Sequence, residues 1–186
     1  MKQGQETSSK CFVYILVGVV LVSAAALVFA LVFMKPKTPD VELSMVSVNN
    51  LSYGYSTSPS FSMKLAAELT IKNSNFGLFK FKNSSLSFLY GGNITVGRAE
   101  LRSGRVKSRK TKRVNVLVVA RSQELLSDSQ NLGSDINSGM LKLSSYAELK
   151  GEVHLVRGLE NRRTPVLNCT MIVRFASLYV EDLLCN

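Results

Sequence analysis

The residue types that catalysis requires are thinly supplied in this sequence. Its 186 residues include one histidine, His154, and no tryptophan. His154 stands between Val153 and Leu155, so we expect its side chain to point away from an apolar face. The acidic residues are scattered without a pair spaced for acid–base chemistry, and no GxSxG, HExxH, Walker or CxxC motif occurs. The sequence therefore predicts a protein that is not an enzyme, with no cofactor and no metal site.

Positive charge is concentrated in residues 98–113, where eight cations accompany one acid, Glu100. The whole chain has a formal net charge of +10, which favours anionic partners such as lipid headgroups or acidic polysaccharide. Nucleic acid is not expected, because this run has no aromatic side chain on which a base could stack. In the alternative interpretation the run is a solvated hairpin that protects a sheet edge from aggregation. The predicted contact residues are Arg102, Arg105, Lys107, Arg109, Lys110, Lys112 and Arg113.

Two of the three cysteines lie near the C-terminus, at Cys169 and Cys185. In an oxidising compartment they could form a disulfide whose loop of roughly 15 residues is worth about 3 kcal/mol in the chain-entropy model. The alternative is a buried Cys169 that acts as a small hydrophobic residue beside a free Cys185.

The elements that position these residues begin with an uncharged run of 24 residues, 11–34. About 20 apolar residues cross a bilayer as a helix, so this run predicts a transmembrane segment. A cleaved signal peptide is the alternative, but its apolar region usually has only about 7–15 residues. The predicted organisation is a cytosolic tail (1–10), an uncleaved signal-anchor helix (11–34), a linker (35–40) and one domain (41–186). The linker is short, so we expect the domain to stay close to the bilayer.

Basic residues flank both ends of the span about equally and do not fix its orientation. Acceptor patterns for N-glycosylation do suggest one, because all of them follow the span. They begin at Asn50, Asn83, Asn93 and Asn168. With the cysteines, they favour a cytosolic N-terminus and an extracellular, glycosylated domain.

The domain has a hydrophobic period of two, which is typical of strands. Odd positions from Phe61 to Ile71 are apolar, and the even positions between them are polar except Ala66. Similar alternation covers 86–90, where Gly91-Gly92 signals a turn, and also 114–118 and 167–175. Weaker runs lie near 42–48, 94–101 and 141–156. We therefore expect about seven strands in an all-β antiparallel sandwich, with 122–139 forming a short helix or a loop.

Several short motifs together resemble a plant protein family. These are Ile71-Lys-Asn-Ser-Asn-Phe-Gly-Leu-Phe-Lys-Phe81, Leu89-Tyr-Gly-Gly92, Val96-Gly-Arg-Ala99 and the basic run before a valine-rich strand. With the short tail, single span and two late cysteines, the chain resembles the group-two late embryogenesis abundant family, which includes harpin-induced-like and disease-resistance-associated proteins. Many members have Asn-Pro-Asn where this chain has Asn73-Ser-Asn75.

The resemblance implies an immunoglobulin- or fibronectin III-like sandwich at the plant plasma membrane, without catalytic activity. It also implies a role in stress or defence, with the lipid bilayer, anionic headgroups, acidic cell-wall polysaccharide or other membrane proteins as partners. Two alternatives remain: a domain that binds lipid, and a folded protectant of membranes during dehydration.

Overall fold

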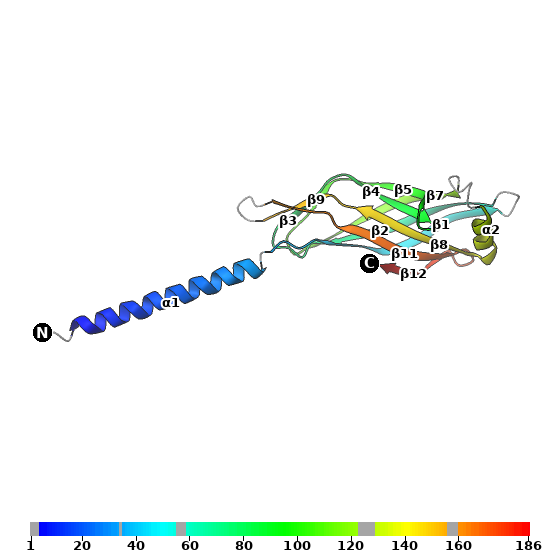
Figure 1. Ribbon diagram of the computed structural model, residues 1–186. Coiled ribbons are helices and arrows are strands. Elements are labelled where there is room, and N and C mark those ends of the chain that lie inside the picture. Colours follow the sequence, from blue (N-terminus) through cyan, green and yellow to red (C-terminus); the bar gives the residue numbers. More distant parts are fainter. Residues whose placement is uncertain (1–3, 34, 55–58, 123–128, 156–159) are drawn as a thin grey trace. The chain divides into compact units, whose positions relative to one another are not determined.

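The computed structural model describes residues 4–33, 35–54, 59–122, 129–155 and 160–186 (Figure 1). The chain divides into two compact units, Met1–Pro36 and Lys37–Asn186. Parts of four predicted segments lie outside the described residues: 1–3 of the tail, Met34 at the end of the span, 123–128 within the segment 122–139, and Val156 at the end of the run 141–156.

The first unit contains a single helix, α1 (Gly4–Phe33). Its segment Cys11–Ala30 has 20 residues and a mean hydropathy of 2.8, so it is long and apolar enough to cross a bilayer. The Ser23 hydroxyl donates to the carbonyl oxygen of Val19 at 2.7 Å, which satisfies this polar group within the helix. A signal sequence near the N-terminus would meet the same criterion of length and composition.

The second unit is the all-β antiparallel sandwich that the sequence predicts. Its described strands form three sheets, ordered β1-β2-β7, β10-β9-β3-β6 and β12-β11-β8-β4-β5. β1 packs against β11 and β12, and β5 packs against β7, so the first and third sheets meet along both edges (Figure 1). The bounds are β1 (Asp40–Gly54), β2 (Ser60–Lys72), β3 (Leu78–Phe81), β4 (Ser84–Tyr90), β5 (Ile94–Leu101), β6 (Gly104–Val106), β7 (Thr111–Arg121), β8 (Met140–Glu148), β9 (Gly151–His154), β10 (Glu160–Arg163), β11 (Val166–Arg174) and β12 (Tyr179–Cys185).

Alternating side chains from all three sheets fill one hydrophobic core. The predicted apolar face of β2 is confirmed, because every odd position from Phe61 to Ile71 is buried. Phe88 on β4 and Val173 on β11 are also fully buried. Gly97 on β5 lies against β7: a Cβ there would be 2.7 Å from Val118 Cγ1. A side chain at this position would therefore separate the two strands.

The expected number of strands is too low. The structure adds the short strands β3, β6 and β10, and it divides the predicted run 141–156 into β8 and β9. It also adds β12, which follows β11 after the turn 175–178. Within the described part of 122–139, Ser129–Ser138 forms α2, and its Leu132 and Ile136 reach the core.

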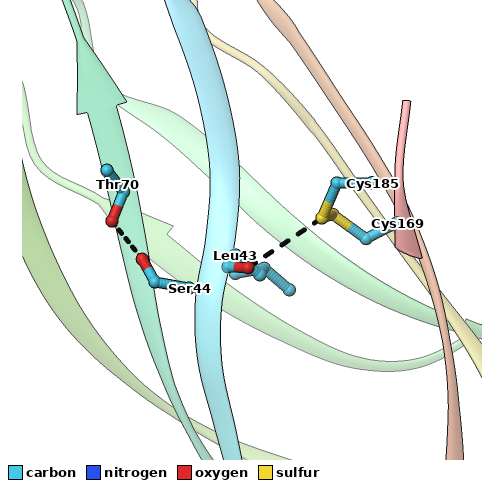
Figure 2. The surroundings of a disulfide bond; sticks show 5 residues. All are labelled: Leu43, Ser44, Thr70, Cys169 and Cys185. Carbon is cyan, nitrogen blue, oxygen red and sulfur yellow. Dashed lines mark hydrogen bonds between the residues drawn. A yellow bond between two sulfur atoms is a disulfide. The ribbon is translucent and has the colours of Figure 1, made fainter. Parts of the chain in front are cut away.

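One even position of β2, Thr70, is buried, and a bulge in β1 explains it. The register of β1 on β2 shifts between Leu43 and Met45, and the hydroxyls of Ser44 and Thr70 form a hydrogen bond (Figure 2). Beside this bulge, Cys169 and Cys185 form a disulfide. Cys185 Sγ lies 4.0 Å from the carbonyl oxygen of Leu43 (Figure 2). A disulfide sulfur carries no proton, so this is a packing contact.

The alternation of buried and exposed positions along the strands predicts that Phe88 and Leu117 contribute very differently to the free energy of unfolding. Replacing the fully buried Phe88 with Ala should lower the free energy of unfolding by about 3–5 kcal/mol, because it removes contacts and leaves a cavity. The matched change Leu117→Ala alters a side chain that is 79% exposed and should stay within about 0.5 kcal/mol. Urea unfolding of the full chain in detergent measures both. Equal losses would contradict the observed register of β7.

Candidate functional site

The structure divides the predicted contact residues of the basic run among five environments. Arg105 lies on the short strand β6, whereas Lys107, Arg109 and Lys110 occupy the turn before β7. Lys112 Nζ lies 5.8 Å from the centre of the Phe81 ring. The remaining two residues, Arg102 and Arg113, are placed apart from this group.

Arg113 and Arg102 belong to other surfaces of the domain. Arg113 points outward from the first sheet, where its Nε lies 3.6 Å from Glu68 Oε1. Arg102 lines a polar hollow of about 640 Å³ together with Arg98 and Glu100. The predicted seven-residue surface is therefore not one continuous patch.

The turn 107–110 is held by the buried side chain of Asn73, which is 1% exposed. Asn73 Nδ2 donates to the carbonyl oxygens of Gly77 at 2.8 Å, Val106 at 3.1 Å and Lys107 at 3.2 Å. A carboxamide has only two such protons, so at least one of them is shared. Asn73 thereby joins the loop after β2 to the end of β6.

Asn75 extends this connection to the first residue of the domain. Its Oδ1 accepts from Lys37 N at 2.6 Å, and its Nδ2 donates to Lys37 O at 2.7 Å. The Asn75 carbonyl oxygen accepts from Arg109 N at 3.1 Å and from Ser108 Oγ at 3.0 Å. Asn73 Oδ1 accepts from both nitrogens of Asn75. We call Asn73 and Asn75 the asparagine clasp, and we call Lys37 with residues 73–77 and 107–110 the tip.

A second group of cations lies on the outer side of the four-stranded sheet. Lys80 on β3 is paired in register with Arg105 on one side and with Glu152 on the other. Glu152 is in turn paired with Arg162 on β10, whose Nε lies 3.8 Å from Glu152 Oε1. Paired residues point to the same side of a sheet, so Lys80, Arg105 and Arg162 form a basic face with a single acid between them.

Sequence reasoning identified only Arg105 of this basic face. Lys80 lies inside a recognised motif, and its alternation with the buried Phe79 and Phe81 could have indicated an outward side chain. No sequence signal brings Arg162 to the same face, because that requires the pairing of β10 with β9. Lys82 and Lys150 line a hollow of about 280 Å³ with Arg162, which adds further positive charge beside the face.

The other residues considered in the sequence analysis are either exposed to solvent or in contact with a neighbouring polar group. The side chains of Asn50, Asn83, Asn93 and Asn168 are all exposed. Asn83 Oδ1 also accepts from Ser103 N at 2.7 Å. His154 Nδ1 lies 2.9 Å from Glu160 Oε1 across the β9–β10 pair. Among the described residues, no group of three or more His, Cys, Asp or Glu side chains could hold a metal ion.

Sequence comparison relates this chain to a plant protein. A late embryogenesis abundant protein of Arabidopsis thaliana, At1g64065, is 32% identical over 186 residues, which is 100% of this chain and 86% of that protein. The chain belongs to the late embryogenesis abundant family. No family model matches the sequence.

Solved structures resemble this late embryogenesis abundant protein only distantly. The solution structure of At2g46140.1, described as a late embryogenesis abundant protein, is 11% identical with a TM-score of 0.38, covering 92% of this chain and 87% of its own. An X-ray structure of the structural-genomics target SoR45 is 8% identical with a TM-score of 0.46, covering 77% and 92%. At these scores the likeness supports no argument, and the family assignment rests on the sequence relative.

The asparagine clasp should contribute to stability. Asn73→Ala removes a buried carboxamide that donates to the carbonyl oxygens of Gly77, Val106 and Lys107, so it should lower the free energy of unfolding by about 2–3 kcal/mol. Ser74→Ala, at the half-buried neighbouring position, is the matched control and should change stability by less than about 0.5 kcal/mol. Thermal unfolding of the two variants measures the difference. Equal midpoints would show that the clasp does not support the fold.

Proposed function

We propose that this late embryogenesis abundant protein is a non-enzymatic, membrane-anchored binding protein of plant stress or defence responses. Its β-sandwich presents the basic face to an anionic partner at the boundary between plasma membrane and cell wall. The main supporting observation is that cations from three strands distant in sequence, Lys80, Arg105 and Arg162, gather on one side of one sheet.

The proposed topology places the N-terminus in the cytosol, α1 across the plasma membrane and the sandwich outside the cell. The length and hydropathy of α1 support anchoring. The disulfide between Cys169 and Cys185 is typical of proteins outside the cytosol. The exposure of all four asparagines in the acceptor patterns is compatible with glycosylation there.

An acidic polysaccharide suits the basic face because it carries many carboxylates along one chain. Neighbouring strands lie about 4.8 Å apart, so a polymer that crosses the sheet can contact several cations at once. Each exposed ion pair is weak, at roughly 0.2–1 kcal/mol, and useful affinity requires several of them together. Glu152 offsets part of the charge, since it is close to Arg162.

An apolar hollow supports a second candidate function, the binding of lipid in dehydration tolerance. The hollow has a volume of about 470 Å³ and lies over β8, β11 and β12, with Leu143, Met171 and Leu184 among its lining residues. Leu184 is 66% exposed, which leaves apolar surface available to an acyl chain. A lipid retained in mass spectra of the purified protein would favour this second function.

The proposed function predicts a charge-dependent affinity for polygalacturonate, an acidic polysaccharide. Lys80→Gln, Arg105→Gln and Arg162→Gln together should weaken binding about tenfold, since three exposed ion pairs at roughly 0.5 kcal/mol each correspond to that factor. Binding by the full chain in detergent can be followed by fluorescence anisotropy of labelled polymer at low salt.

The control removes three charges from other exposed positions: Lys64→Gln, Arg121→Gln and Lys142→Gln. This variant has the same net charge as the triple variant of the basic face and should bind almost like the wild type. If both triple variants lose the same affinity, net charge rather than the basic face explains binding. If neither loses affinity, the electrostatic account of the function is wrong.

A further inference from the structure

The tip combines three exposed cations with an exposed aromatic ring. Lys107, Arg109 and Lys110 are exposed, and in the part of the chain that the structure describes none of them is paired with a carboxylate. Phe76 is 45% exposed, and the guanidinium carbon of Arg109 lies 4.1 Å from the centre of its ring. An unpaired group of cations around an exposed ring differs from the basic face, where Glu152 stands among the cations.

An unusual backbone conformation at Arg109 accompanies the contact of its guanidinium with the Phe76 ring. Arg109 has φ of 55°, a left-handed conformation that glycine or asparagine adopts more readily than arginine. Its N–H donates to the Asn75 carbonyl oxygen, so the asparagine clasp holds the turn in this conformation. The fold thus tolerates a disfavoured backbone at the position whose side chain covers Phe76.

The asparagine clasp also fixes where the chain enters the domain. Both backbone polar groups of Lys37 bond to Asn75, the residue before Phe76. Only residues 34–36 separate Lys37 from Phe33, where α1 ends, and three extended residues reach only about 10 Å. If α1 is a membrane anchor, this short connection keeps Lys37, and with it the tip, within reach of the lipid headgroups.

We propose that the tip docks on the phospholipid headgroups of the bilayer that anchors the chain. Arg109, Lys107 and Lys110 bind headgroup phosphates, and Phe76 enters the interfacial layer. Phenylalanine is among the residues that interfacial segments bury at the boundary between headgroups and acyl chains, and a guanidinium matches the geometry of phosphate. Each basic residue near an anionic surface adds about fivefold to affinity, so three add roughly a hundredfold. The inference rests on the membrane anchoring in the proposed function.

The absence of tryptophan allows a direct test of docking. Phe76→Trp introduces one fluorophore at the tip, and Tyr146→Trp introduces one at a position of nearly equal exposure, 46%. We call these the tip reporter and the control reporter. Each full-length variant is reconstituted into vesicles of phosphatidylcholine and phosphatidylserine, with or without bromine on the acyl chains. Either orientation of the protein presents the domain to a leaflet of the same composition.

If the tip docks, bromine should quench the tip reporter strongly and the control reporter little. Adding Lys107→Gln, Arg109→Asn and Lys110→Gln should lower the docking equilibrium about a hundredfold and abolish the quenching. Asparagine is chosen at position 109 because it tolerates a left-handed backbone. The same number of charges removed by Lys64→Gln, Arg121→Gln and Lys142→Gln should leave the quenching of the tip reporter unchanged.

Three results would overturn the proposal, and flotation of the vesicles separates the first two. If the protein floats with the vesicles but the tip reporter is quenched no more than the control reporter, anchoring stands and docking of the tip is wrong. If the protein floats neither with the brominated nor with the unbrominated vesicles, anchoring itself is wrong, and the docking that rests on it is overturned too. Quenching that persists after the tip cations are removed would contradict their role.

Discussion

Two buried carboxamides, those of Asn73 and Asn75, are the constraint on which the tip of this domain depends. They connect Lys37, the loop after β2 and the end of β6 through hydrogen bonds of 2.6–3.2 Å. Both side chains are almost fully buried, where an unpaired polar group is costly. The arrangement therefore strongly favours one geometry. It fixes the start of the domain, the aromatic ring of Phe76 and the basic turn as one unit.

This geometry separates positive charges that are continuous in the sequence. The turn 107–110 belongs to the tip, Arg105 belongs to the basic face, and Arg113 pairs with Glu68 on another sheet. The two partners that we propose, which differ in chemistry, therefore involve neighbouring parts of one basic run. A membrane surface suits the tip because Phe76 accompanies its cations, whereas a linear acidic polymer suits the basic face, whose residues are paired across neighbouring strands.

The sequence predicted the long strands and the sandwich because their alternation is local. It missed β3, β6 and β10, which have only three or four residues each, and it did not separate β9 from β8. Asn73 and Asn75 belong to a motif that carries the family resemblance, but their contacts with Lys37 and Val106 cross 38 and 33 positions of the chain. For the same reason, Arg162 could not be assigned to the basic face before the strand order was known.

Anchoring by α1, with the sandwich outside the cell, is the claim on which the proposed function depends most. The most direct measurement compares the electrophoretic mobility of the protein expressed in plant cells with that of a variant in which Asn50, Asn83, Asn93 and Asn168 are changed to Gln. We predict that the wild type migrates as the heavier species and that deglycosylation removes the difference. Equal mobility before and after deglycosylation would contradict this topology and would favour a sandwich on the cytosolic side.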